Sequence, residues 1–241
     1  MNWAPAMRAW SVGYLAATVC AVAGLTHAAA PNYAARRSAM VDRLRKEGLR
    51  NERVLAAMGR VPRHLFLGPE YRGSAYEETE IPIGFGEVTL APHAVGLMTE
   101  ALDPRPRAKI LEIGTGCGYH TAVLAELTAN VFTIEIRRQL ADSARARLRA
   151  LGYTCVQCKT GDGAQGWAEK APFDGILVTC AVDRLPQPLV DQLADGGRIV
   201  VPIGSGPEQT LNCVYKVGGR LRSEAVATLR VAPMITRQQA Q

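Results

Sequence analysis

Residues 108–119 read AKILEIGTGCGY, an apolar run followed by a turn with three glycines. The apolar run predicts a buried strand, and the residues after the turn predict a helix. A strand, a glycine-rich turn and a helix form the first unit of nucleotide-binding α/β folds. The glycines let a ligand approach the backbone, and the helix points its N–H groups at that ligand. The turn alone does not name the ligand, because proteins that bind NAD or FAD contain it as well.

Strands and helices alternate on the C-terminal side of this turn. The expected strands are 108–113, 130–136, 153–159, 173–181 and 196–204, with helices to about Thr128, over 137–151 and over 186–194. Two further β-type runs, 209–217 and 220–231, flank Gly218-Gly219, which is a hairpin signal. The pattern predicts an α/β protein with a doubly wound, mostly parallel, Rossmann-like sheet and an antiparallel terminal hairpin.

The chain before the turn is helical and irregular in pattern. Apolar spacing predicts a helix over 34–47 that ends at a glycine, and Asn51 caps a second helix through Met58. Residues 81–91 (IPIGFGEVTLA) are expected to form a loop, and Pro92 then begins a helix to Leu102. We therefore expect an N-terminal helical arm over 31–80, followed by the ligand-binding domain over 81–241.

The first thirty residues have the pattern of a secretory signal peptide. Arg8 is the only charge before Arg36, residues 9–25 are apolar, and Thr26-His27-Ala28-Ala29-Ala30 supplies small residues for cleavage. The apolar stretch is short and rich in Ala and Gly for a membrane span. We expect export to the periplasm or the medium, with no stable membrane span after cleavage. A translation start at Met40 would instead leave the protein in the cytoplasm.

Composition excludes several classes of protein. The chain is 48% hydrophobic and 21% charged, as is usual for a globular protein, and only 6% aromatic, so a base-stacking surface for nucleic acid is not expected. Nine basic and three acidic residues lie between Arg36 and Arg63. This segment is either a solvated helical face or a basic arm that attracts an anionic peptide or membrane surface.

Cysteine spacing suggests no metal site. Five cysteines remain after Cys20, an odd number, and Cys155 and Cys158 form the one C-x-x-C pair. Both lie in an expected strand, where residues three apart point to opposite faces. We therefore expect these two cysteines to be structural.

Three carboxylates narrow the choice of ligand. Glu112 precedes the glycines, where it suits an amino group and repels a pyrophosphate. Glu135 closes the second strand, 21 residues after Gly114, which is the place for a carboxylate that grips ribose hydroxyls. Asp162 closes the third strand, where it faces an adenine edge. An amino-acid end, a ribose and an adenine without phosphates describe S-adenosyl-L-methionine. The predicted cofactor residues are Glu112, Gly114, Thr115, Gly116, Gly118, Glu135, Asp162 and Gly163.

Short segments outside the glycine turn carry a more specific resemblance. They are Arg60-Val61-Pro62-Arg63, Ile81-Pro82-Ile83-Gly84-Phe85, Ala91-Pro92-His93, Leu111-Glu112-Ile113-Gly114-Thr115-Gly116, Gly161-Asp162-Gly163, Ala171-Pro172-Phe173-Asp174 and Val231-Ala232-Pro233-Met234. With them the chain from about Met40 to Ile235 resembles the protein-L-isoaspartate O-methyltransferase family. The resemblance implies a seven-stranded methyltransferase fold and a monomer that transfers methyl from S-adenosyl-L-methionine to L-isoaspartyl and D-aspartyl residues of damaged proteins. It places the acceptor peptide at Ile83, Gly84, Pro92 and His93.

The chemistry needs no general base. A carboxylate has a reference pKa of about 4, so it is already ionised at neutral pH and attacks the methyl group directly. His93 and His120 are the histidines nearest these motifs, and both are expected to be structural.

One loop departs from the family pattern. The family usually has Thr-Ile-Ser where this chain has Val88-Thr89-Leu90, so Thr89 carries the only hydroxyl and is the candidate catalytic residue. Two functions stay open: a methyltransferase of damaged carboxylates, or a non-catalytic or differently specific protein whose acceptor pocket has diverged. An NAD-dependent enzyme is a weaker third alternative, because Glu112 would repel the pyrophosphate.

Overall fold

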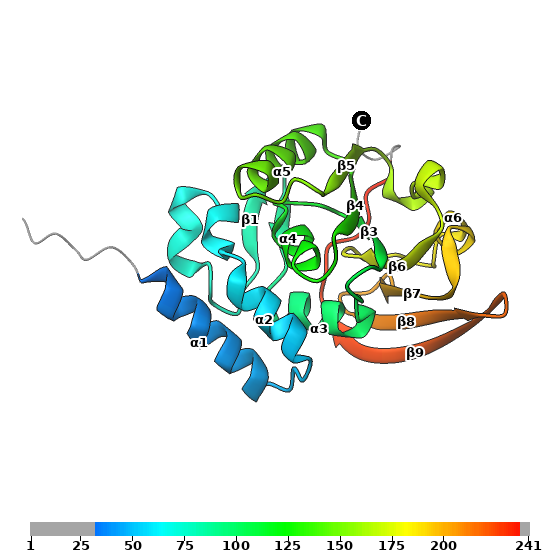
Figure 1. The fold of residues 1–241 in the computed structure, drawn as a ribbon, viewed down its shortest axis with the longest axis horizontal. Coiled ribbons are helices and arrows are strands. Elements are labelled where there is room, and N and C mark those ends of the chain that lie inside the picture. The colour runs from blue at the N-terminus through cyan, green and yellow to red at the C-terminus, as the bar shows by residue number, and fades with distance from the viewer. Residues whose placement is uncertain (1–31, 237–241) are drawn as a thin grey trace, which may run out of the picture. The chain divides into compact units, whose positions relative to one another are not determined.

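Seven strands form the central sheet, in the order β5-β4-β3-β6-β7-β8-β9 (Figure 1). Their bounds are β3 (Lys109–Ile113), β4 (Asn130–Glu135), β5 (Gln157–Thr160), β6 (Phe173–Val178), β7 (Leu193–Ile203), β8 (Gln209–Val217) and β9 (Arg220–Leu229). The pairs from β5 to β7 are parallel, and β7–β8 and β8–β9 are antiparallel. The predicted fold class, including its terminal hairpin, is confirmed.

The computed structural model describes residues 32–236. The predicted signal peptide over 1–30 lies outside these residues. Within the described chain, no helix is both long and apolar enough to cross a membrane.

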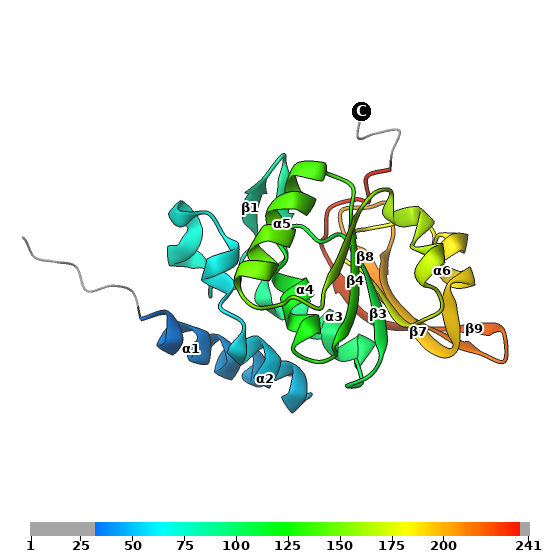
Figure 2. The same ribbon diagram turned by 45° about the horizontal axis from the view of Figure 1, so that its top comes forward.

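Helices cover both faces of the sheet because its strands are apolar on both faces. One face carries α3 (Pro92–Leu102), α4 (Tyr119–Ala125) and α5 (Arg138–Ala150), and the other carries α6 (Gln187–Asp191) (Figure 2). Alternate residues of β3 show the division: Ile110 packs with α3 and α4, whereas Leu111 packs in the cluster that contains Leu189 of α6. Short 3₁₀ turns complete the fold at η1 (Arg63–Phe66), η2 (Pro69–Ser74), η3 (Gly163–Gln165) and η4 (Ala168–Lys170).

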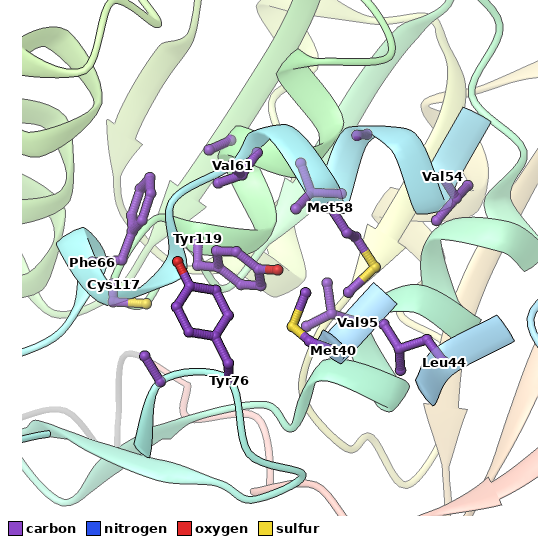
Figure 3. Close-up of a cluster of buried hydrophobic side chains, with 14 of the residues drawn as sticks. Met40, Leu44, Val54, Met58, Val61, Phe66, Tyr76, Val95, Cys117 and Tyr119 are labelled. Carbon is purple, nitrogen blue, oxygen red and sulfur yellow. The ribbon is translucent and has the colours of Figure 1, made fainter. Parts of the chain in front are cut away.

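The N-terminal arm packs into the same core as the sheet domain. Met40 of α1 (Tyr33–Lys46) and Met58 of α2 (Glu52–Arg60) are fully buried in one cluster with Tyr119 of α4 (Figure 3). The arm thus contributes to the apolar layer that supports the helix after the glycine turn.

Carboxylates of the fold neutralise much of the basic segment. The ion pairs are Arg36–Glu77, Arg43–Glu78, Arg45–Glu52 and Arg60–Glu126. This pairing favours the first of the two interpretations, a solvated helical face, over a free basic arm.

The expected loop over 81–91 is instead a β-hairpin. Strands β1 (Ile81–Gly84) and β2 (Glu87–Thr89) pair antiparallel in a two-stranded sheet of their own. The chain turns at Gly84, Phe85 and Gly86, with φ of 97°, 57° and 78°. Glycine has no Cβ, so the two glycines adopt this conformation without a clash.

Two other boundaries differ from expectation. The strand expected over 153–159 begins only at Gln157, so Cys155 is exposed in a turn while Cys158 is on β5, and both are free thiols. The helix expected over 186–194 ends at Asp191, because β7 begins at Leu193 and pairs that residue with Phe173.

Candidate active site

The carboxyl ends of the parallel strands open into one cavity. Its walls come from residues 113–117 after β3, 134–136 after β4, 179–180 after β6, 87–90 of the hairpin and 232–235 near the C-terminus. β3 is the first strand of the sheet and its neighbours β4 and β6 lie on either side of it. The cavity therefore lies at the switch point of the doubly wound sheet, where such folds bind ligands.

Glycines bring the backbone to the cavity wall. Gly114 and Gly116 line the cavity with φ of 94° and 53°. A Cβ on Gly114 would lie 2.3 Å from Oγ1 of Thr179, and one on Gly116 would lie 3.2 Å from Ile83. Gly118 caps the N-terminus of α4 with φ of 90° and does not line the cavity. Two of the three glycines of the turn thus face the ligand space, and the third has the left-handed conformation that the start of α4 requires.

Glu135 presents a carboxylate to the cavity, and its contact with ribose hydroxyls stays a prediction. Its Oε2 accepts a hydrogen bond from the backbone N–H of Gly116 at 2.9 Å, and its Oε1 accepts one from that of Arg137 at 3.0 Å. These two bonds fix the carboxylate at the end of β4. Each oxygen keeps a lone pair for a hydroxyl donor of a ligand.

Glu112 lies beneath the cavity rather than in its wall, so the predicted direct contact with a ligand's amino group is corrected. Its side chain is fully buried, and its Oε2 accepts hydrogen bonds from the hydroxyls of Thr121 and Thr133. Thr133 is in turn 2.6 Å from the hydroxyl of Thr115, which lines the cavity. Glu112 therefore supports the glycine turn through these threonines.

Burial controls the charge of Glu112. The pKa of its carboxyl is raised from 4.5 to about 8, mainly by removal from water and to a smaller extent by the nearby charge of Glu135, against the two threonine hydrogen bonds. Its Oε1 has no hydrogen-bond partner among the described residues. Glu112 is therefore mostly neutral at pH 7.

The predicted adenine contact is divided between two neighbours. Asp162 caps η3 by accepting a hydrogen bond from the N–H of Ala164 at 2.9 Å, and its side chain does not line the cavity. Gly163 does line it, and a Cβ there would lie 2.2 Å from Ile113. The backbone at Gly163, rather than the Asp162 carboxylate, borders the ligand space in this structure.

The hairpin supplies the acceptor side of the cavity. Ile83, Val88, Thr89 and Leu90 all line it, and Thr89 is 8% exposed. The other three predicted acceptor residues lie outside the cavity wall, and their contact with an acceptor peptide stays a prediction. Gly84 belongs to the hairpin turn, Pro92 is buried in the first turn of α3, and the His93 N–H donates to the Glu78 carboxylate; none of these three lines the cavity.

His120 lines the cavity as a neutral hydrogen-bond acceptor. Its Nε2 is 2.8 Å from the hydroxyl of Thr99, which donates its own proton to the carbonyl of Val95. Nε2 must therefore carry the imidazole proton, and Nδ1 is left as an acceptor without a partner among the described residues. Burial lowers the pKa of His120 to about 3, so the ring holds no second proton at neutral pH.

Two parts of the wall were not predicted from the sequence. Thr179 and Cys180 follow β6, and residues 232–235 cover the cavity from the C-terminal side. The second segment is held by two backbone hydrogen bonds, from Ala181 to Ala232 at 2.8 Å and from Met234 to Ala181 at 2.7 Å. The Val231-Ala232-Pro233-Met234 segment contributed to the family resemblance but predicted no contact by itself.

The side chains of the cavity fit a ligand that has hydroxyl groups, apolar surface and a positive charge. Two carboxylates, Glu87 and Glu135, line the cavity, with apolar side chains of Ile134, Ile136 and Leu140 beside them. No Lys or Arg side chain from the described part of the chain lines it. A phosphate would find no cation here, whereas a positively charged ligand such as S-adenosyl-L-methionine would meet no like charge in these walls.

This fold and site define a class I methyltransferase, which takes its methyl group from S-adenosyl-L-methionine. The profile of the protein-L-isoaspartate(D-aspartate) O-methyltransferases matches residues 35–239, and the chain belongs to that family.

Relatives and solved structures agree with this assignment. The protein-L-isoaspartate O-methyltransferase of Dictyoglomus turgidum is 45% identical over 205 residues, 85% of this chain and 93% of the relative. That of Methanoregula boonei is 47% identical over 200 residues, 83% of this chain and 92% of the relative. A solved protein-L-isoaspartate O-methyltransferase superposes with a TM-score of 0.75 at 27% identity, over 82% of this chain and 65% of that one. A structure from Plasmodium falciparum in complex with S-adenosyl-L-homocysteine, at 21% identity over 83% of this chain and 99% of that one, shares the fold with a TM-score of 0.73.

Proposed function

We propose that the chain is an S-adenosyl-L-methionine-dependent carboxyl methyltransferase that acts on L-isoaspartyl and D-aspartyl residues of damaged proteins and so begins their repair. Membership of the family supports the reaction, since the match extends over residues 35–239. The observation that carries the proposal is the single cavity that joins the glycine turn and Glu135 to the hairpin with Thr89. The alternative, a protein that has lost catalysis, is not favoured, because both halves of this cavity are built.

The residues divide between holding the cofactor and orienting the acceptor. Glu135 would accept from the ribose hydroxyls, and the backbone of Gly114, Gly116 and Gly163 would lie against the ligand. When bound, S-adenosyl-L-methionine supplies an electrophilic methyl group. Thr89 is the hydroxyl on the acceptor side, where it would donate a hydrogen bond to the acceptor carboxylate and hold it in line. Positioning of this kind, with water excluded by the apolar walls, accounts for most of the expected rate.

No residue of the site needs to move a proton. The acceptor carboxylate is ionised at neutral pH, and the neutral His120 has its pKa lowered to about 3 by burial. Methyl transfer converts the carboxylate to an ester without releasing a proton from the acceptor.

Transfer of a labelled methyl group tests the proposal. The purified chain is mixed with tritiated S-adenosyl-L-methionine and either an isoaspartyl peptide or its aspartyl twin. We expect label in the isoaspartyl peptide alone. Thr89→Ala should lower kcat/KM and Thr89→Ser should retain most of it, since only the hydroxyl matters. Label in neither peptide, with cofactor binding intact, would contradict the proposed acceptor.

We also propose that the chain is exported, with residues 1–30 removed. The basis is the order of charge, apolar stretch and small residues in the sequence. N-terminal sequencing of the protein from its source cell should give a first residue near Pro31. A protein that begins at Met1 or Met40 would contradict export and place the enzyme in the cytoplasm.

A further inference from the structure

The two ends of the β1–β2 hairpin have different surroundings. It forms a two-stranded sheet that is separate from the central sheet. At its base Ile81 is buried in the apolar core, and Arg63 donates a hydrogen bond to the carbonyl of Leu90 at 2.9 Å. Its turn, Gly84 to Gly86, has three successive left-handed residues, and Phe85 at the tip is 54% exposed. The apolar core therefore holds the base of the hairpin, whereas the position of the turn side depends on other contacts.

One ion pair provides a tie on the side of the turn. Nε of Arg137 lies 2.8 Å from Oε1 of Glu87, and the two side chains are only 27% and 22% exposed. Among the described residues, this is the only ion pair between 81–89 and the rest of the chain. A partly buried pair is screened less by salt than a surface pair.

The arginine of this pair follows directly after the segment 134–136, which lines the opposite side of the cavity. Its backbone N–H donates to Oε1 of Glu135 at 3.0 Å, and Oε2 of Glu135 accepts from Gly116 at 2.9 Å. A continuous series of contacts thus runs from Glu87 through Arg137 and Glu135 to the glycine turn. Glu87 and Glu135 line the same cavity, so this series of contacts joins two of its sides.

We propose that Glu87 and Arg137 form a positioning pair that couples occupation of the cofactor half of the cavity to the placement of the hairpin that carries Thr89. A ligand held by Glu135 restricts the 135–137 turn, which fixes the arginine and, through it, the hairpin. Coupling is reciprocal, so a fixed hairpin also strengthens binding at Glu135. The inference rests on the proposed function for the assignment of the two halves to cofactor and acceptor.

The test measures binding and hairpin order without an acceptor. S-Adenosyl-L-homocysteine is titrated into the full chain by calorimetry, and hydrogen–deuterium exchange is followed over residues 84–90 with and without it. The variants are Glu87→Gln, Arg137→Gln and the double variant. Glu52→Gln breaks the exposed Arg45–Glu52 pair, far from the cavity wall, and is the matched control.

We expect S-adenosyl-L-homocysteine to slow exchange over 84–90 in the parent and in Glu52→Gln. In Glu87→Gln this protection should be lost, and affinity should fall about fivefold, at the lower end of typical couplings. Arg137→Gln should do the same, and the double variant should lose no more than either single variant.

Three outcomes would overturn the coupling. They are equal protection in Glu87→Gln and the parent, additive losses in the double variant, and unchanged affinity in all variants. Any of these with methyl transfer intact would leave the proposed function standing. A parent that binds no S-adenosyl-L-homocysteine would overturn both, whereas binding and protection without methylation of an isoaspartyl peptide would contradict the acceptor alone.

Discussion

Glu112→Gln should flatten the dependence of stability on pH, because it removes a buried ionisable group and keeps its shape. The amide oxygen of glutamine would still accept from Thr121 and Thr133, as Oε2 of Glu112 does now. The amide nitrogen would take the place of Oε1, which has no partner among the described residues. The hydrogen bonds that support Thr115 would therefore survive the change.

The size of the effect follows from the pKa of Glu112. Burial raises this pKa from 4.5 in the unfolded chain to about 8 in the folded protein. The folded state holds the proton more tightly, so its stability is highest below pH 4.5 and falls as the pH rises toward 8. Between about pH 5.5 and pH 8 this group alone costs about 3 kcal/mol in the free energy of unfolding. Glutamine carries no such cost.

Urea unfolding at both pH values measures the difference. The free energy of unfolding of Glu112→Gln minus that of the parent should increase by about 3 kcal/mol between about pH 5.5 and pH 8. Glu169→Gln, at a side chain that is 74% exposed, controls for the change in net charge. If Glu112→Gln and the parent lose stability in parallel, Glu112 ionises normally and the reasoning fails.

Three further predictions concern the cavity walls. His120→Gln should remove a loss of stability at acid pH, because burial lowers the pKa of His120 from 6.5 to about 3. As the pH falls from 6.5 to 5, the free energy of unfolding of the parent, measured with urea, should fall by about 2 kcal/mol from this group. The variant should not show this loss. Glu135→Gln should weaken S-adenosyl-L-methionine binding by about 1–3 kcal/mol in calorimetry, and unchanged affinity would remove Glu135 from the cofactor site. The triple change Val88→Thr, Thr89→Ile and Leu90→Ser should raise kcat/KM for an isoaspartyl peptide about tenfold, because one regained hydrogen bond of about 1.4 kcal/mol corresponds to a tenfold rate. A slower triple variant would mean that Leu90 suits the natural substrate.

Sequence patterns predicted the sheet well because most of its strands have clear local signals in the sequence. The apolar runs at β3, β4 and β6 and the glycine pair after β8 each specify one kind of element. The hairpin at β1–β2 was missed because strands of four and three residues are too short for a clear period, and only the tertiary fold shows that they pair.

The candidate site was predictable only where the path of the backbone determines the position of a residue. Gly114 and Glu135 sit at strand ends, and the ends of adjacent parallel strands must meet. The position of the Glu112 side chain was predicted wrongly because the strand pattern does not show which groups surround it. The hydroxyls of Thr121 and Thr133, on neighbouring elements, bind its carboxylate beneath the cavity. The wall from residues 232–235 depends on a contact with Ala181, about fifty residues earlier in the chain, which no local pattern reveals.

The two edges of the central sheet bear on how the protein behaves in concentrated solution. A free strand edge can pair with the edge of another molecule, and such pairing begins aggregation. At one edge β5 has only four residues, which is too short for stable pairing. At the other, β9 has ten residues and exposes Leu221 and Val226, but it also carries the charged pair Arg222 and Glu224 and faces a β8 that is bulged between Leu211 and Asn212. Charge at β9 and the bulge in β8 thus protect the longer edge, and removal of Arg222 and Glu224 would leave the exposed Leu221 and Val226 without a charged pair between them.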